Sequence, residues 1–511
     1  MSAQVGDILA IHAASKPDKV AVIEEDFTLT FAEVDERANR FAAALAALGV
    51  GEGDRVAGIG YNSYETTETT FAGQRLKAVG VPVNWHLKPP EITYILNDCG
   101  AKALIAGPEF VDAVEQARPS VAGELHFIAL RGEPPPGWLS YPQLLAEHAG
   151  PGLRQDDARL GATMIYTSGT TGRPKGAFRP NGVSIENVLQ TIAIFGLNEN
   201  DVHLVAGPGY HSAVAYFRTL HHLVGATVVV ERKFDALQAL QYIERYRVTT
   251  TFMAPTLIAR MLNLPEEVRA QIDHSTLRAI IAGAAPFPAA LKERCEAYFG
   301  PVLWEFYGAT ETGINTVLRP EDQLRKPGSC GEAVPGQEIR LLDENGDEVP
   351  DGTPGEFWVR NSALAEYYNR PDATANSMRD GFFSVGDIAY RDADGYYYIC
   401  DRKIDMIISG GVNIYPAEIE AALVAHPAVE DVAVIGVPNE EFGEEVKAVV
   451  KLKRGEWAEA DDLIAFAGQR LAGYKRPRSV DFVDELPRDL AGKLQKRRLR
   501  DRYWTTAERR I

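Results

Sequence analysis

Short apolar runs alternate with amphipathic helical patterns over residues 1–110, and the alternation resumes over residues 183–300. Short apolar runs bounded by turn residues are typical of strands, and apolar residues at intervals of three and four are typical of helices. Repeated alternation of the two predicts an α/β fold of layered helices around a largely parallel sheet. The strands are expected at residues 21–23, 55–59, 79–83, 103–105, 202–205, 226–230, 249–252 and 277–282.

The helix expected after Thr30 has the clearest boundary signals. Thr30 is a preferred N-cap residue, and Glu33 stands three residues later, as in a capping box. Apolar residues then recur on one helical face, and Gly49 follows the last of them. We therefore expect a helix that runs to about Leu48.

Two regions depart from this alternation. Residues 120–160 are rich in proline, glycine and charge, so we expect a loop-bearing connector there. Residues 328–400 contain short strand patterns separated by turns, which predict a β-rich subdomain. Its strands are expected at residues 338–342, 355–359 and 395–400.

The length of 511 residues exceeds what one hydrophobic core supports, so the chain is expected to form two or more domains. The last hundred or so residues return to a mixture of strands and helices. We place the boundary in the loop between Arg402 and Asp405. This gives a large N-terminal domain over residues 1–403 and a small α+β C-terminal domain over residues 404–511.

The stretch YTSGTTGRPKGA, from Tyr166 to Ala177, has the composition of a phosphate-binding loop. Its glycines let the backbone approach a ligand closely, its hydroxyls add hydrogen-bond donors, and Lys175 adds a positive charge. It is not a Walker motif, because Pro174 precedes the lysine and Gly176 follows it. A flexible linker is the alternative interpretation of such a Gly/Ser/Thr tract taken alone.

Three further segments carry candidate functional residues. YGATETG, from Tyr307 to Gly313, offers an aromatic ring, a hydroxyl and a carboxylate. Asp387 and Arg402 could accept from and donate to the two hydroxyls of a ribose. Lys493 follows a glycine near the chain end. Each of these residues, taken alone, is more often a solvated loop residue.

Together these motifs resemble the adenylate-forming superfamily, the acyl-CoA synthetases and their relatives. They occur in that family's order and at roughly its spacing, over nearly the whole chain from Thr30 to Lys493. The resemblance implies a large N-terminal domain, a small mobile C-terminal domain and an active site between them. It also implies a ligase that adenylates a carboxylic acid with ATP and Mg²⁺, releases pyrophosphate, and transfers the acyl group to coenzyme A with release of AMP.

The resemblance also implies residue roles. Lys175, Thr310, Glu311 and Lys493 would be catalytic, with Lys493 between the substrate carboxylate and the α-phosphate, and Glu311 and Thr170 would hold Mg²⁺. The ATP site would comprise Thr167, Ser168, Gly169, Thr170, Thr171 and Gly172 at the phosphates, Gly283, Ala284, Ala285, Tyr307 and Gly308 at the adenine, and Asp387 and Arg402 at the ribose.

For the second half-reaction, the family swings its C-terminal domain about a hinge. Gly410 and Gly411 would then let a pantetheine arm pass, and Lys475 and Arg476 would meet the phosphates of coenzyme A. The chain departs from the family at the hinge position, where Ile404 replaces the usual Lys or Asp. A second departure is Val412, which stands where a Glu commonly precedes the Asn of this loop.

Residues 207–213 match the place where family members set a His or an aromatic side chain against the acyl group. The substrate candidates are Tyr210, His211, Ser212, Gly308 and Gly313. Amino-acid-activating relatives carry an Asp near this place, but residues 207–217 contain no carboxylate. The expected lining is small and apolar, which favours a bulky fatty, aromatic or polycyclic acid over acetate.

The net charge of −18 argues against nucleic acid as a partner. Basic residues nevertheless crowd the C-terminal end, where we expect a solvated helix face. These residues are Lys493, Lys496, Arg497, Arg498, Arg500 and Arg502. The four cysteines show no metal or disulfide spacing, and the sequence begins without a signal-peptide pattern and contains no membrane-span pattern, so we expect a cytoplasmic protein.

Three functional hypotheses stay open at this point. The first is a coenzyme A ligase, for which the segment around Lys475 and Arg476 is the specific support. The second is a stand-alone adenylating enzyme that loads the phosphopantetheine of a carrier protein. The third is a non-catalytic nucleotide or acyl binder, which Ile404 alone supports. Homodimer formation also stays open.

Overall fold

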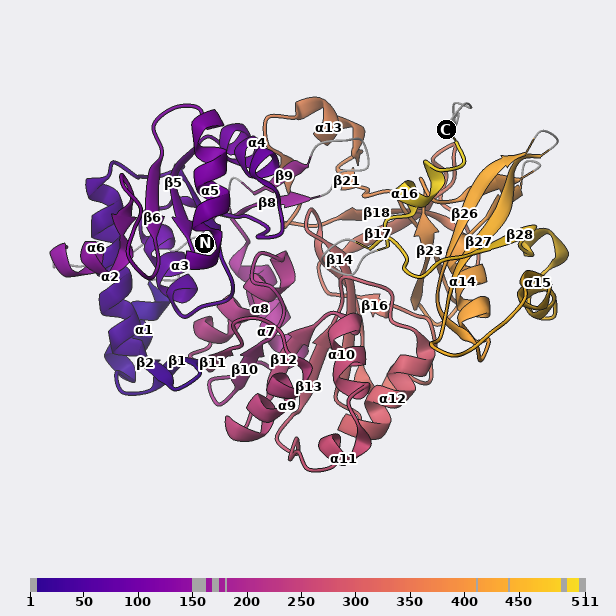
Figure 1. Ribbon diagram of the computed structural model, residues 1–511, viewed down its shortest axis with the longest axis horizontal. Helices are drawn as coiled ribbons and strands as arrows, with labels where there is room; N and C mark the ends of the chain where they lie inside the picture. Colours follow the sequence, from indigo (N-terminus) through magenta and orange to yellow (C-terminus); the bar gives the residue numbers. More distant parts are fainter. Residues whose placement is uncertain are drawn as a thin grey trace.

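The computed structural model describes residues 7–148, 162–167, 174–179, 182–409, 412–439, 442–488 and 494–504. Two sheets with mainly parallel strands form the N-terminal half (Figure 1). The larger has the strand order β16-β15-β14-β13-β12-β10-β11-β1-β2, and its pairs from β14 to β1 are all parallel. Its strands are β1 (Val20–Glu24), β2 (Phe27–Thr30), β10 (Val202–Val205), β11 (Thr227–Val230), β12 (Thr250–Met253), β13 (Ala279–Ala282), β14 (Leu303–Ala309), β15 (Gly313–Leu318) and β16 (Glu332–Ala333).

The second sheet is entirely parallel, with the order β4-β3-β5-β6-β7. Its strands are β3 (Arg55–Ile59), β4 (Val79–Pro82), β5 (Ala101–Ala106), β6 (His126–Ala129) and β7 (Leu139–Ser140). The prediction of an α/β fold with largely parallel sheets is confirmed. The helices of this half are α1 (Ile8–Ser15), α2 (Phe31–Ala47), α3 (Glu65–Arg75), α4 (Pro89–Cys99), α5 (Val111–Ala117), α6 (Tyr141–Glu147), α7 (Ile185–Phe195), α8 (Ser212–Leu223), α9 (Ala236–Arg245), α10 (Pro255–Leu262), α11 (Glu266–Arg269) and α12 (Ala289–Phe299).

The start of α2 forms as its sequence indicates. The Thr30 side chain accepts from the backbone N–H of Glu33 at 3.3 Å, and the Glu33 carboxylate accepts from the Thr30 N–H at 2.7 Å. This reciprocal capping box satisfies two N–H groups that a helix start otherwise leaves unpaired. The apolar face of α2 is buried, from Phe31 through Phe41 to Leu45.

The expectation of a connector over residues 120–160 is wrong for its described part. Residues 126–147 contain β6, β7 and α6, and they contribute Phe127, Ile128 and Tyr141 to the core. The strands β6 and β7 are short, and the polar turns around them dominate the local composition. Burial of these strands within the second sheet decides the structure here, and local composition does not reveal that burial.

The β-rich subdomain is present as expected, between the α/β half and the C-terminal segment (Figure 1). Its antiparallel sheet contains β17 (Glu338–Leu342), β18 (Gly355–Arg360), β20 (Met378–Arg379), β21 (Phe382–Phe383), β22 (Asp387–Arg391) and β23 (Tyr397–Arg402), with α13 (Pro371–Asn376) beside it. A small sheet of β19 (Glu366–Tyr367), β9 (Lys175–Phe178) and β8 (Met164–Thr167) joins this subdomain to the α/β half.

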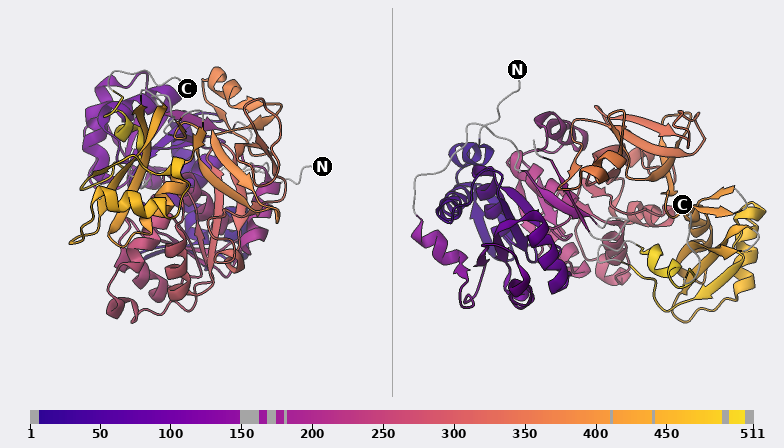
Figure 2. Two further views of the ribbon diagram at one scale, coloured as in Figure 1. Left: turned by 90° about the vertical axis from the view of Figure 1, so that its right-hand side faces the viewer. Right: turned by 90° about the horizontal axis from the view of Figure 1, so that it is seen from above.

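The C-terminal segment lies at one end of the molecule in two perpendicular views (Figures 1 and 2). It consists of β24 (Ile407–Ser409), β25 (Val412–Ile414), β26 (Val429–Asn439), β27 (Gly443–Leu452), β28 (Ser479–Phe482), α14 (Pro416–Val424), α15 (Ala460–Gly468) and α16 (Lys496–Arg500). Its two apolar clusters draw on residues from 407 onward, and the other clusters draw on residues up to 399. A large N-terminal domain and a small C-terminal domain are therefore present, while the boundary at 403/404 stays a prediction.

The expectation of a fully solvated basic face at the C-terminal end is wrong for two residues of α16. Lys496 and Arg500 are buried, whereas Arg497 and Arg498 are exposed. Lys496 pairs with Glu420, and Arg500 pairs with Asp405. In the described ranges, no helix is long and apolar enough to cross a membrane.

Candidate active site

The hairpin of β8 and β9 places two of the predicted phosphate-binding residues side by side. Thr167 and Lys175 are cross-strand partners in this hairpin. Lys175 was expected in a loop, but it is the first residue of β9, and its ammonium lies 4.9 Å from the centre of the Tyr367 ring. The residues between the two strands, 168–173, lie outside the described residues. The roles predicted for Ser168, Gly169, Thr170, Thr171 and Gly172 therefore stay predictions.

The carboxylate of Glu311 lies next to this hairpin. Its Oε1 accepts hydrogen bonds from the Thr167 hydroxyl and from the Tyr367 hydroxyl, each at 3.1 Å. Glu311 is buried, so these donors compensate for part of its lost hydration. Burial first, and then the neighbouring negative charge, raise the pKa of Tyr367, which keeps its hydroxyl a donor at neutral pH. Thr167, expected at the phosphates, and Glu311, expected at the metal, are thus in direct contact.

Thr310 is connected to the expected acyl site by a direct contact. Its hydroxyl lies 3.2 Å from that of Ser212, and its carbonyl accepts from the guanidinium of Arg179 at 2.6 Å. Ser212 opens α8, which follows β10, whereas Thr310 follows β14. Parallel strands bring their carboxyl ends to one edge of a sheet, where α/β proteins commonly bind ligands.

The predicted ribose-binding pair also forms. Asp387 and Arg402 are cross-strand partners in β22 and β23, with Arg402 Nε 3.0 Å from Asp387 Oδ1. The second oxygen, Oδ2, accepts from the Tyr307 hydroxyl at 2.5 Å. Burial opposes the charge of Arg402, but the negative charges of Asp387 and Glu311 help to outweigh burial, and the pKa of Arg402 is raised. Arg402 therefore links the ribose pair electrostatically to Glu311.

Small residues shape the backbone around Tyr307. Tyr307 and Gly308 belong to β14 rather than to the loop expected there, and Gly308 pairs with the opening of β15. A Cβ atom at Gly308 would lie 2.1 Å from the carbonyl oxygen of Gly313, so only glycine fits. After β13, Ala284 has a φ of 71°, in the left-handed region. A Cβ atom at the preceding residue, Gly283, would lie 3.0 Å from the Phe306 ring. Ala285 follows in the same turn.

An aromatic wall surrounds the expected acyl residues Tyr210 and His211. Their rings lie 4.4 Å apart, and the Trp85 ring meets Tyr210 edge to face at 6.2 Å. Trp85 in turn stacks on His86 at 3.4 Å and contacts Tyr61 at 4.9 Å. The wall comes from two sheets, because Trp85 follows β4 and Tyr210 follows β10.

The C-terminal candidates are only partly described. Gly410, Gly411 and Lys493 lie outside the described residues. Lys475 is held by both oxygens of Glu418, at 2.7 and 2.6 Å, and Arg476 is exposed beside it. These two residues belong to the C-terminal segment, away from the hairpin of β8 and β9 (Figure 1).

Sequence reasoning missed three residues that contact the predicted site. Tyr367 bonds to Glu311, Arg179 bonds to the backbone of Thr310, and Trp85 packs on Tyr210. Arg179 directly follows β9, the strand after the predicted phosphate loop. This position is the one sequence signal from which Arg179 could have been predicted. Tyr367 and Trp85 carry no local signal, because contacts between distant segments place them.

The chemistry of this site suits a nucleotide with an acidic substrate. Cations, hydroxyl donors and the buried carboxylates of Glu311 and Asp387 lie around the end of β14. Within the described ranges, no three acidic, His or Cys side chains gather as a metal centre. A single carboxylate is nevertheless a usual protein contribution to Mg²⁺, which takes its other oxygens from phosphates and water.

Comparison with known proteins gives two matches to protein-family models. Residues 9–369 match the AMP-binding enzyme family, and residues 418–493 match the AMP-binding enzyme C-terminal domain. Indoleacetate–CoA ligase of Aromatoleum aromaticum is 37% identical and covers 95% of both chains.

Two further similarities span almost the whole chain. The fatty acid–[acyl-carrier-protein] ligase ScoC of Streptomyces coeruleorubidus is 36% identical, over 98% of this chain and 97% of that protein. Among solved structures, ATP-bound MatB from Rhodopseudomonas palustris superposes with a TM-score of 0.85 at 32% identity, and covers 97% of this chain and 98% of its own.

Proposed function

Because the chain belongs to the AMP-binding enzyme family, we propose that it is an ATP-dependent acid–thiol ligase. In the first half-reaction a carboxylate oxygen attacks the α-phosphorus of ATP. The bond from that phosphorus to the oxygen that bridges it to the β-phosphate breaks, and pyrophosphate leaves with this oxygen. In the second, a thiol attacks the acyl carbon, the bond from that carbon to the phosphate oxygen breaks, and AMP leaves while the thiol proton is released to solvent. The single observation that carries this proposal is that Tyr367 contacts both Lys175 and Glu311, while Tyr307, four residues before Glu311, bonds Asp387 of the Asp387–Arg402 pair.

The first step brings two anions together, so the site must supply positive charge and donors. Lys175 would meet the phosphates, and the Thr310 hydroxyl would donate to an α-phosphate oxygen. Arg402 would donate to ribose hydroxyls and Asp387 accept from them. Glu311 would hold Mg²⁺, which supplies charge neutralisation at the phosphates when bound. The acid is ionised at neutral pH, so the site needs no general base.

We further propose a bulky apolar acid as the substrate. The described residues 207–217 contain no carboxylate to pair with an amino group, and the wall of Trp85, Tyr210 and His211 offers flat apolar contact. Indoleacetate, the acid in the name of one relative, is a bulky acid with a flat, largely apolar ring system. A fatty acid of similar bulk suits the same wall.

A carrier protein as acceptor is the second candidate. Lys475, which was expected to meet the phosphates of coenzyme A, is engaged by both oxygens of Glu418. A phosphate must displace this carboxylate before it can use the lysine. A carrier protein brings its thiol on a phosphopantetheine arm and does not require that exchange.

The test combines purified protein, Mg-ATP and a panel of acids, with free coenzyme A, with a phosphopantetheinylated carrier protein, or with neither. Mass spectrometry detects acyl-AMP and thioesters. We expect acyl-AMP and acyl-CoA from indoleacetate or fatty acids and little from acetate. Acyl-AMP that reacts only with the carrier would favour the second candidate, and no product with any acid would favour a non-catalytic binder.

Lys493→Ala tests the division between the half-reactions. We expect adenylation to fall by at least about a hundredfold, because a charge at the reacting phosphate is lost. The variant should still convert supplied acyl-AMP and thiol into thioester. Equal loss in both half-reactions would contradict a lysine that serves only the first.

A further inference from the structure

Asn62 is a buried amide whose hydrogen-bonding groups are all engaged. Its Nδ2 donates to the carbonyls of Gly207 and Glu231, each at 2.9 Å, and its Oδ1 accepts from the N–H of Gly209 at 2.7 Å. An asparagine amide has two N–H donors and one carbonyl acceptor, and two carbonyls and one N–H face it here. The environment therefore fixes the orientation of the amide, which is 7% exposed.

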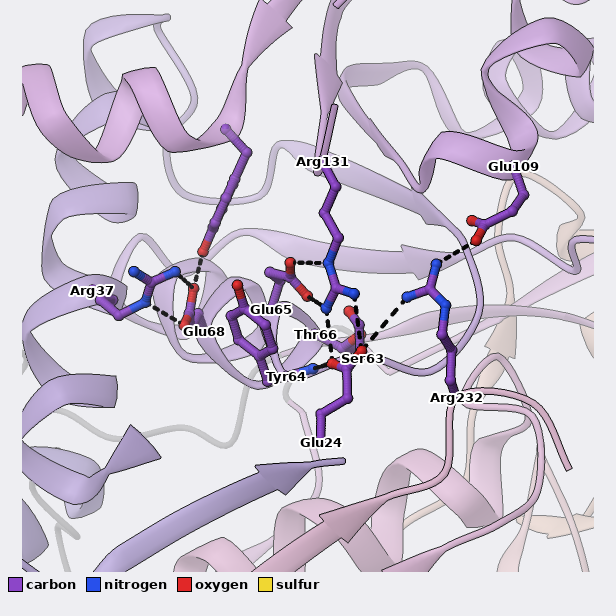
Figure 3. Close-up of polar contacts among 11 residues, drawn as sticks. Glu24, Arg37, Ser63, Tyr64, Glu65, Thr66, Glu68, Glu109, Arg131 and Arg232 are labelled. Atoms are coloured by element: carbon purple, nitrogen blue, oxygen red, sulfur yellow. Dashed lines mark hydrogen bonds and ion pairs between the residues drawn. The ribbon is translucent and has the colours of Figure 1, made fainter. Parts of the chain in front are cut away.

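The backbone that carries Asn62 is itself held firmly. The N–H of Asn62 donates to the Arg232 carbonyl at 3.1 Å, and the N–H of Tyr64 donates to the carboxylate of Glu24 at 2.9 Å. Figure 3 shows Arg131 between Glu24 and Glu65, with hydrogen bonds to both carboxylates. These contacts join the carboxyl ends of β1, β6 and β11 to the segment after β3. These hydrogen bonds therefore hold the backbone around Asn62 in place.

The loop that Asn62 holds leads directly into the predicted acyl site. Residues 207–211 connect β10 to α8, and Tyr210 and His211 follow Gly209 without a gap. A Cβ atom at Gly209 would lie 2.9 Å from Asn62 Oδ1, so the two residues are in tight contact. Asn62 follows β3 of the second sheet, and the loop follows β10 of the larger sheet.

We propose that Asn62 is a positioning residue for the acid substrate. It fixes the path of the 207–211 loop, and so sets where Tyr210 and His211 stand against the acyl group. This role rests on the proposed function. The described residues expected to meet ATP lie on β8, β9, β14, β22 and β23, in the turn after β13 and in the turn between β14 and β15, so the effect of Asn62 is specific to the acid.

Removal of the amide leaves the Gly207 carbonyl and the Gly209 N–H without this partner. A buried polar group that loses its hydrogen bond is costly, so the loop is expected to move until these groups find water or other partners. Displacements of about 1 Å at substrate-positioning elements reduce catalysis strongly. The displaced wall then fits the preferred acid less well, while ATP binding is retained.

The first test measures steady-state kinetics of Asn62→Ala with the best acid of the panel. We expect KM for the acid to rise by more than about tenfold, with KM for ATP unchanged. Asn97→Ala is the control, because Asn97 holds residues 120–122 in the same way, by donating to Ser120 O and accepting from Ala122 N. Asn97 is more exposed, so thermal unfolding of both variants is recorded as well. An equal rise of both KM values in Asn62→Ala would overturn the proposal.

The second test approaches the contact from the loop. Gly209→Ala places a methyl group against Asn62 Oδ1, and no left-handed backbone angle forbids alanine there. We expect the same selective rise in KM for the acid. In the Asn62→Ala background the obstructing oxygen is gone. Gly209→Ala should therefore raise KM for the acid much less there than in the wild-type background.

The combined outcomes separate this role from the proposed function. Selective effects of both single variants and a less-than-additive double variant would support the positioning role. Strictly additive effects, or an active wild-type enzyme with unchanged acid kinetics in a folded Gly209→Ala variant, would overturn it and leave the ligase assignment standing. A wild-type protein inactive with every acid would overturn the proposed function and the positioning role together.

Discussion

Glu231 directly follows β11, and only one of its two carboxyl oxygens has a hydrogen-bond partner. Its Oε1 accepts from the N–H of Asp235 at 2.7 Å, while Oε2 is buried without a hydrogen bond. Burial raises the pKa of Glu231 to about 8; the charge of Asp235 adds to the shift, and Asp235 N–H and Arg260 oppose it. The carboxyl is therefore protonated in the folded protein at neutral pH and ionised in the unfolded chain.

This difference predicts a pH dependence of stability that Glu231→Gln removes. The unfolded chain releases the proton above its ordinary pKa near 4.5, but the folded chain keeps it until about 8. Stability from this group is therefore present below the unfolded pKa and is lost as pH rises through that window, by up to about 1.4 kcal/mol per pH unit. We expect the melting temperature of Glu231→Gln to rise relative to that of the wild type as the pH increases from 5 to 8.5. Parallel melting profiles would contradict the raised pKa.

At the scale of elements, the junction of β14 and β15 carries five of the predicted site residues, namely Tyr307, Gly308, Thr310, Glu311 and Gly313. Tyr307 and Thr310 lie in or next to it, and the register of the strands shifts between Tyr307 and Gly308. Gly308 makes this close approach feasible, since a Cβ there would overlap the Gly313 carbonyl. The positions of Tyr307 and Thr310 therefore depend on Gly308, which has no side chain and can contact a ligand only through its backbone.

Gly308→Ala should therefore destabilise the fold by about 2 kcal/mol or more, because the backbone of the strand pair must move. Activity should fall with it, since Thr310 lies close behind in the chain. Gly73→Ala is the matched control: Gly73 is within α3 and a Cβ there meets nothing within 4 Å, so we expect a gain of about 0.5–1 kcal/mol. Thermal and chemical unfolding of both variants measure this. Similar stability of the two would show that the junction adapts.

The same junction shows which site residues local sequence patterns predict and which they do not. Glycines, hydroxyls and the YGATETG order are local signals of the site, and the capping box of Thr30 and Glu33 is a local signal of the start of α2. Tyr367 and Asn62 could not be found in this way. Their importance depends on contacts with residues more than fifty positions away, and neither has a local pattern that differs from an ordinary polar loop. The strand β6 was missed for a related reason, because its four residues are identified by burial and not by periodicity.

At the scale of the whole molecule, an ion-pair network surrounds the expected hinge. Lys496 of α16 lies 2.9 Å from Glu420 and 3.5 Å from Asp401, which belongs to β23 of the β-rich subdomain. Arg500 donates to the carbonyl of Ile404 at 2.8 Å and pairs with Asp405 at 2.7 Å. The apolar Ile404 side chain cannot make the polar contacts usual at this position. Buried charges from α16 instead hold the backbone on both sides of it.

We therefore expect Arg500→Ala to change the balance between the half-reactions rather than the chemistry of either. The arrangement described here is stabilised by the Arg500 contacts, so their loss lowers its population relative to the alternative required by domain alternation. The rates of pyrophosphate release and of thioester formation from supplied acyl-AMP should then move unequally, with their ratio changed by about tenfold for the loss of one buried charged pair. Arg498→Ala is the control, because Arg498 is exposed on the same helix and should leave the ratio unchanged. If Arg500→Ala lowers both rates by one common factor, the network serves stability alone, and the hinge keeps its balance without it.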